Sequence, residues 1–75
     1  MSISPNTRSH AIQSTLMAFS EAMHHLAGQS LEAFHASKRG DHALALGTLL
    51  DAPDRLNEAQ ALLQVAILLL RRDWP

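Results

Sequence analysis

A ten-residue stretch near the C-terminus, residues 61–70, constrains the fold of this chain more than any other feature. Nine of its ten residues are apolar, and we expect it to form the centre of a helix over residues 55–72. On such a helix the polar residues gather in one narrow strip, formed by Asn57, Gln60, Gln64 and Arg71. A helix that is apolar around most of its circumference has to be covered on most sides. The rest of the chain is too short to do so, and the sequence therefore predicts that another chain contributes.

The size of the chain points the same way. Its 75 residues form one domain at most. A domain this small buries only about 60–65% of its unfolded surface. Small domains usually gain stability from disulfides, from a metal or from association with another chain. The sequence has no cysteine, which excludes disulfides and thiolate metal sites and fits the reducing cytosol. We expect a cytoplasmic protein. Because disulfides are excluded, we expect association with another chain to stabilise it.

Residues 10–39 have the spacing of an amphipathic helix. Apolar side chains recur every three or four residues along one face, at Ile12, Leu16, Phe19, Met23, Leu26, Ala27, Leu31 and Phe34. This stripe keeps its phase through Gly28, which favours a single long helix. The alternative is a break at Gly28, with Ser30 capping a second helix. Residues 1–9 are polar and are predicted to be a flexible leader before a helical domain over residues 10–75.

A reversal of the chain is predicted at Gly40. Two cations precede it, as suits the last turn of a helix, and glycine suits the left-handed position that follows. Asp41 can cap a short second helix over residues 42–50, and Asp54 can cap the third helix after the interruption at Pro53. The expected fold is all-α: a long helix packed against two shorter helices, as an αα-hairpin or a three-helix unit.

Part of this hairpin resembles a known repeat. Residues 31–52 resemble a single tetratricopeptide-type helical hairpin, on the strength of Ala33, Gly40, Asp41, Ala45, Leu49 and Ala52. The resemblance implies that the two helices approach closely at Ala33 and Ala45. In size and helix order the chain also looks similar to the small needle chaperones and co-chaperones of bacterial type III secretion. That second resemblance implies a chaperone that covers the apolar helix of an export subunit.

Residues with catalytic or metal-binding chemistry are few. The five histidines are His10, His24, His25, His35 and His42, and no two of them have the i, i+4 spacing of a metal pair on one helix. His35 and His42 could approach each other across the turn, but a third ligand is lacking. No serine lies in a nucleophile motif. We therefore expect no enzyme activity, no metal, no cofactor and no small-molecule substrate.

Charge and hydropathy exclude further classes of partner. The net charge of −1 provides no electrostatic footprint for nucleic acid, and the apolar run is about half the length of a membrane span, which needs roughly 20 residues. Basic pairs at Lys38-Arg39 and Arg71-Arg72 could come together if the third helix runs back along the first. A small DNA-binding regulator of helix-turn-helix type is an alternative, although residues 42–50 lack the basic and amide side chains of a recognition helix.

The predicted binding surface follows from how the third helix is expected to face the first. We expect the face toward the first helix to be formed by Leu56, Ala59, Leu63, Ala66, Ile67 and Leu70. The residues left over, which point away or lie at the flank, form the predicted partner-binding surface: Ala61, Leu62, Val65, Leu68 and Leu69. The sequence thus predicts a non-enzymatic module, a chaperone or adaptor, that buries a partner helix. Two alternatives are a homodimeric helical bundle and a closed three-helix bundle in which the second helix covers this surface.

Overall fold

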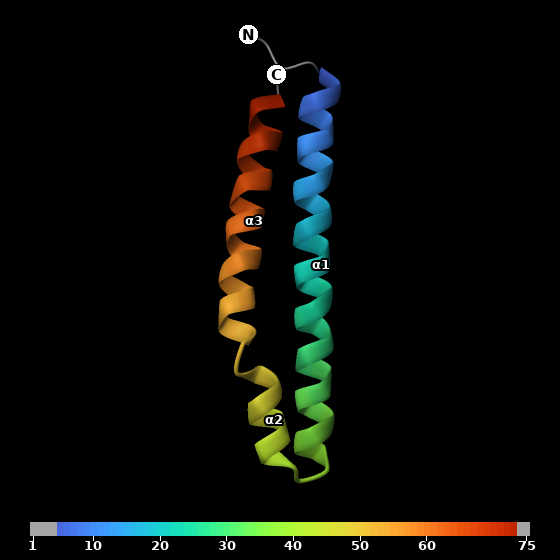
Figure 1. Ribbon diagram of the computed structural model, residues 1–75, viewed down its shortest axis with the longest axis vertical. Helices are drawn as coiled ribbons and strands as arrows, with labels where there is room; N and C mark the ends of the chain where they lie inside the picture. Colours follow the sequence, from blue (N-terminus) through green and yellow to red (C-terminus); the bar gives the residue numbers. More distant parts are fainter. Residues whose placement is uncertain (1–4, 74–75) are drawn as a thin grey trace.

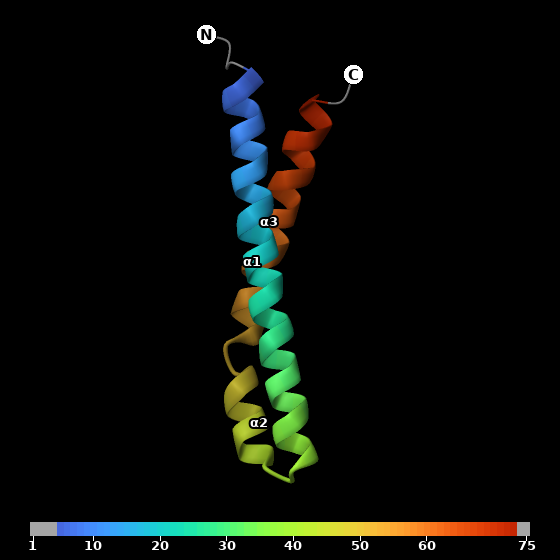
Figure 2. The same ribbon diagram turned by 90° about the vertical axis from the view of Figure 1, so that its right-hand side faces the viewer.

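The computed structural model describes residues 5–73, which form three helices: α1 (Pro5–Lys38), α2 (His42–Leu49) and α3 (Ala52–Asp73). α2 and α3 follow one another back along α1, so that the end of α3 and the start of α1 lie at the same end of the molecule (Figure 1). The Cα atoms span 58 × 19 × 15 Å, and the two long helices lean apart toward their free ends (Figure 2). No strand occurs within residues 5–73, and the prediction of an all-α fold is confirmed.

The fold is an open hairpin rather than a closed bundle. α1 contacts both α2 and α3 along its length, whereas α2 and α3 touch each other only slightly. Together α2 and α3 form the second arm of the hairpin (Figure 1). Since α2 continues the line of α3 instead of folding over it, α2 cannot shield the outer faces of α3. The closed three-helix alternative is therefore wrong for this chain.

The reversal at Gly40 has the hydrogen bonds of a glycine-terminated helix. Gly40 has φ +83°, the left-handed conformation that favours glycine. Its N–H donates to the carbonyl of Ser37 at 2.9 Å, and the N–H of Asp41 donates to the carbonyl of Ala36 at 2.8 Å, which together make a Schellman motif. The Asp41 carboxylate then accepts from the N–H of Leu44 at 3.1 Å and caps α2. Both predicted roles, helix stop and helix cap, are confirmed.

Two helices begin earlier than the sequence predicted. α1 begins at Pro5 rather than His10, so residues 5–9 of the predicted leader are helical, and residues 1–4 lie outside the described residues. α3 begins at Ala52, which places Pro53 and Asp54 in its first turn. The physical reason is the same at the starts of both helices. A proline in the first turn removes only an N–H that has no hydrogen-bond partner within the helix, so the helix can begin there. α1 runs unbroken through Gly28, as favoured from the sequence.

Two glycine substitutions should have opposite effects on stability. An added Cβ at Gly28 or at Gly40 meets no atom within 4 Å, so available space does not distinguish the two sites. Gly28→Ala should raise the free energy of unfolding by about 0.5–1 kcal/mol, because alanine loses less backbone entropy in a helix. Gly40→Ala should lower it by about 1–2 kcal/mol, because the left-handed conformation strains a residue with a Cβ. Urea titrations would measure both, and equal effects would contradict the assigned turn.

The two arms meet along a seam with a seven-residue repeat. Nearly all residues with reduced exposure fall on it, and their spacing alternates between three and four without a break. On α1 the seam residues are Ile12, Thr15, Phe19, Ala22, Leu26, Gln29, Ala33 and Ala36. On α2 and α3 they are Ala45, Thr48, Ala52, Arg55, Ala59, Leu62, Ala66 and Leu69. The repeat thus continues through the α2–α3 junction, and the hairpin has the seven-residue spacing that is typical of an antiparallel coiled coil.

Alanine dominates this seam, and that determines where the larger side chains lie. The buried apolar residues are Ile12, Ala33, Ala36, Ala59 and Ala66. Because alanine adds little bulk, the backbones of the two arms can approach closely, but little hydrocarbon is buried between them. The leucines, methionines and phenylalanines outside the seam stay on the flanks of a thin hairpin.

The apolar stripe predicted on α1 is therefore only partly the buried face. Phe19 and Leu26 lie in the seam, whereas Leu31 and Phe34 are exposed. The predicted stripe follows the largest apolar residues of α1, but near the turn the seam passes through Ala33 and Ala36 instead. Small residues occupy the closest approach because only they permit it, and the larger ones are displaced to the side.

Candidate partner-binding surface

The seam divides the surface of the hairpin into two flanks of different chemistry. One flank, which we call the polar flank, carries a surface hollow of about 310 Å³ near the middle of the hairpin. Both long helices line it, with Ala18, Glu21, Ala22, His25, Arg55, Glu58 and Leu62. A second hollow on this flank, of about 380 Å³, lies near the turn between Glu32, His35 and Arg39 of α1 and Leu44 and Thr48 of α2.

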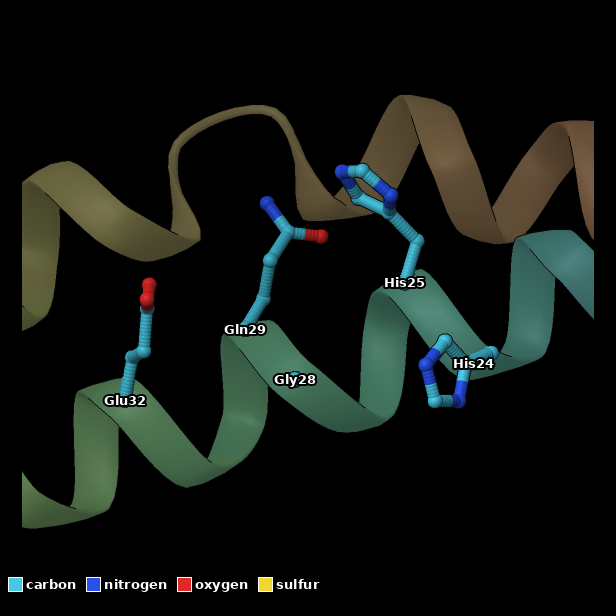
Figure 3. A pocket seen from close by; sticks show the side chains of 5 residues that line it. All are labelled: His24, His25, Gly28, Gln29 and Glu32. Carbon is cyan, nitrogen blue, oxygen red and sulfur yellow. The ribbon is translucent and has the colours of Figure 1, made fainter.

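A polar contact fixes the α2–α3 junction against α1. The side-chain amide of Gln29 donates to the Thr48 carbonyl at 3.1 Å and to the Asp51 carboxylate at 2.5 Å. Figure 3 shows Gln29 reaching from α1 toward the connection between the other two helices. Its amide oxygen is buried and has no hydrogen-bond partner within the described part of the chain. The contact explains why the arm bends at residues 50–51 without leaving the seam.

The charge of Asp51 is favoured by the same contact. The hydrogen bond from Gln29 holds the pKa of the Asp51 carboxyl below its usual value, and the neighbouring Arg55 guanidinium, 3.2 Å away, acts in the same direction. Asp51 is therefore ionised at neutral pH and keeps accepting from Gln29. This cluster has a structural role, since its hydrogen bonds connect Gln29 of α1 to Thr48 and Asp51 at the junction, and Asp51 to Arg55 of α3.

The predicted binding residues separate into an exposed and a half-buried group. Val65 and Leu68 are exposed, at 46% and 59%, and Ala61 is exposed beside them. Leu62 and Leu69 are half-buried, because they belong to the seam. All five lie on the polar-flank side of α3, and Leu62 also lines the 310 Å³ hollow. The residues thus form one surface, with Val65 and Leu68 at its outside and two seam leucines at its base.

The face of α3 that packs on α1 is rotated from the predicted one. Ala59 and Ala66 are buried, as expected, but Leu56 and Leu63 are exposed at 55% and 39%. Ile67 and Leu70, which were also expected to face α1, are exposed too. The seam uses Leu62 and Leu69 in their place, because a seven-residue repeat that includes Ala45 and Ala52 continues into Ala59, Leu62 and Ala66.

Sequence reasoning missed the second flank as a result. Leucines at every seventh residue of the second arm lie beside the seam on the side opposite the polar flank: Leu49, Leu56, Leu63 and Leu70. Leu16 and Met23 occupy the corresponding positions on α1. These six side chains, 39–55% exposed, form what we call the leucine flank. The strict leucine heptad was the available signal, and it was hidden within a run that is apolar on nearly every side.

The histidines do not assemble a site. His24 and His25 point in different directions from α1 (Figure 3). His42 lies within hydrogen-bond distance of Ser37, at 3.4 Å, whereas His35 lines the hollow on the polar flank and packs edge-on against the Phe34 ring. Residues 35 and 37 point about 200° apart on a helix, so His35 and His42 lie on different sides of the hairpin. Within the described residues no three acidic or histidine side chains are grouped to hold a metal.

The remaining surface features are also dispersed. Lys38 and Arg39 lie at the turn, whereas Arg71 and Arg72 lie at the far end of the hairpin (Figure 1). The possibility that the two basic pairs come together is therefore excluded: α3 does run back along α1, but this carries its C-terminal Arg71 and Arg72 away from the turn. Among the described helices none combines the length and hydropathy needed to cross a bilayer.

Comparison with known proteins adds no relative. No protein-family model, curated protein or solved structure matches this chain.

Proposed function

We propose that this chain is a non-enzymatic binding module, a chaperone or adaptor, that covers a helix of another protein. The surface would be the one formed by Ala61, Leu62, Val65, Leu68 and Leu69. One observation carries the proposal: among the described residues five apolar side chains are buried, four of them alanine, while fifteen large ones are exposed. Soluble proteins that act alone rarely leave so much hydrocarbon in contact with water.

The shape of this surface favours a helix as the partner. Val65 and Leu68 stand one turn apart on α3, and Ala11 and Ala18 on the same side of α1 are small. A ridge beside a row of small side chains accepts the apolar face of an amphipathic helix, which presents its side chains at i, i+3, i+4 and i+7. The hollow next to it is lined by Glu21 and Glu58, and the Arg55 guanidinium, which also lines it, is paired with Asp51. A partner helix with a basic residue at the end that faces the turn would therefore fit best.

The test compares two aspartate substitutions on neighbouring residues. Val65→Asp places a carboxylate in the proposed interface and should weaken partner binding about thirtyfold or more, because burying an unpaired charge costs at least 2 kcal/mol. Gln64→Asp adds the same charge on the exposed polar strip and should leave binding nearly unchanged. Tagged wild-type chain and both variants would be used as bait in extracts of the source cells, and the retained protein would then be titrated in purified form.

Circular dichroism serves as the folding control for this comparison. All three chains should have the same helical content, because residues 64 and 65 are both exposed. A partner that binds Val65→Asp as tightly as the wild type would refute the proposed surface. Loss of binding in Gln64→Asp as well would show that added charge, rather than position, is responsible.

A further inference from the structure

We propose that a second copy of this chain docks on the leucine flank, so that two hairpins form a four-helix bundle. The flank consists of Leu16 and Met23 of α1 and the heptad Leu49, Leu56, Leu63 and Leu70 of the second arm. This inference does not depend on the proposed partner helix, because it uses the opposite flank. Four arguments support it: the register, the absence of charge, the distribution of bulk and the area left exposed.

The register places the six side chains on one side of the hairpin. Each of them follows a seam position by four residues, which puts it next to the seam and on the same side in both arms of an antiparallel pair. The contact between Ser37 and His42 near the turn agrees with this placement. Ser37 lies in the α1 row that contains Leu16 and Met23, and His42 lies seven residues before Leu49 in the row of the second arm. Since a seven-residue repeat stays in line with the seam, the row of leucines runs straight along the second arm.

Charge is absent from this side of the molecule. Four rows of residues lie on this side of the seam. On α1 they are residues 13, 20, 27 and 34 and residues 16, 23, 30 and 37; on the second arm they are residues 46, 53, 60 and 67 and residues 49, 56, 63 and 70. None of these sixteen residues is Asp, Glu, Lys or Arg. A two-fold interface buries this surface against its own copy. A charge buried there without a partner would be costly, so a flank without charged residues is suited to a second copy. The hollows of the polar flank, in contrast, are lined by Glu21, Glu32 and Glu58.

The bulk on this flank is distributed so that it can complement itself. Half of the eight positions contributed by α1 are small: Ser20, Ala27, Ser30 and Ser37. The half contributed by the second arm is dominated by leucine. In a two-fold dimer the leucines of one copy can pack over the small residues of the other copy's α1. The two arms of each copy would then act as four helices that bury between them the large apolar side chains excluded from the alanine seam.

The exposed area agrees with an interface of this size. The chain exposes 5999 Å², whereas a compact monomer of its 8.2 kDa mass would expose roughly 4,500 Å². The difference, about 1,500 Å² per chain or about 3,000 Å² for two copies, falls in the range of stable homodimers, about 2,000–5,000 Å².

The first test is the mass of the full chain in solution. At micromolar concentration, sedimentation should give twice the chain mass of 8.2 kDa. The double variant L56E/L63E should sediment as a monomer, because it places two carboxylates in the interface of each copy. The matched double variant V65E/L68E has the same charge change on the opposite flank and should remain a dimer. A monomeric wild type, or a dimer lost only in V65E/L68E, would overturn the proposal.

A second test keeps the proposal falsifiable if L56E/L63E fails to fold. Isotope-filtered NMR on a mixture of labelled and unlabelled wild-type chains detects only contacts between copies. We expect nuclear Overhauser effects between the Leu56 and Leu63 methyl groups of one copy and the Met23 and Ala27 methyl groups of the other. Contacts between copies that involve Val65 and Leu68 instead would refute the leucine flank as the interface. The proposed partner-helix function would fail separately, through the binding of Val65→Asp.

Discussion

Ala66→Asp should unfold most of the protein at neutral pH. Ala66 is 1% exposed in the centre of the α3 side of the seam, and its seam neighbours Leu62 and Leu69 offer no positive charge. An unpaired carboxylate at such a site lowers the free energy of unfolding by about 3–5 kcal/mol. A thin hairpin with an alanine core has little stability with which to absorb that loss. Urea titration followed by circular dichroism would measure it.

Ala61→Asp is the matched control for this prediction. Residue 61 lies on the same helix but is exposed, so its substitution carries the same loss of helix propensity without burial of charge. Its effect on the free energy of unfolding should be less than about 1 kcal/mol. Similar losses in Ala61→Asp and Ala66→Asp would mean that the seam is not the buried interface.

The pH dependence of Ala66→Asp supplies an independent check. Burial raises the pKa of the introduced carboxyl in the folded state above its value of about 3.9 in the unfolded chain. The folded state therefore takes up a proton more readily, and part of the lost stability should return as the pH falls through the raised pKa. Ala61→Asp should not show this recovery. A loss in Ala66→Asp that is independent of pH would point to a steric cause instead.

The sequence was sufficient for the fold wherever local chemistry decided the outcome. The turn could be predicted because glycine in the left-handed conformation and a capping aspartate leave few alternatives at Gly40 and Asp41. Continuity of α1 through Gly28 could be predicted because the apolar spacing keeps its phase there. The early start of α3 does not follow from treating Pro53 as an interruption, because proline is also compatible with a first helical turn. The early start of α1 does not follow from the polarity of residues 5–9, which lack the apolar spacing that indicates a helix.

The orientation of α3 could not be predicted from its own residues. In a segment with leucine on nearly every side, hydrophobicity does not distinguish Leu62 from Leu63. The rotation is seen only in the burial pattern of both arms: Ala36 is buried and Ala45 half-buried near the turn, and the register of the seven-residue repeat that includes them continues along the rest of the hairpin. The residues of the predicted partner surface were chosen without that register. Val65 and Leu68 nonetheless lie outside the seam, while Leu62 and Leu69 lie within it.

The seam also explains why one chain can present two separate surfaces. A hairpin that buried its leucines internally would have a stable core and an inert outside. Here alanine fills the contact between the arms, so large side chains remain available on both sides. The neutral leucine flank and the partly charged opposite flank differ in chemistry, which suits them to different partners. The two proposals imply that the apolar side chains exposed by the hairpin stabilise it through association, so that the stability of the fold would depend on the assembly.

The melting temperature of the wild-type chain should accordingly rise with protein concentration. When two copies unfold together, each tenfold increase in concentration adds about 1.4 kcal/mol to the apparent stability of the dimer. For a unit of twice 75 residues this corresponds to a shift of about 3–6 °C per tenfold change. Thermal melts over a hundredfold range, followed by circular dichroism, would measure it.

The variants of the two flanks should differ in this same measurement. L56E/L63E should melt at a much lower temperature that does not change with concentration, because only the alanine seam would then hold the hairpin together. V65E/L68E should keep the concentration dependence of the wild type, since residues 65 and 68 lie away from the leucine flank. A wild-type melting temperature that is the same at every concentration would mean that the hairpin is stable without a second copy. In that case the leucine flank would not be the origin of its stability.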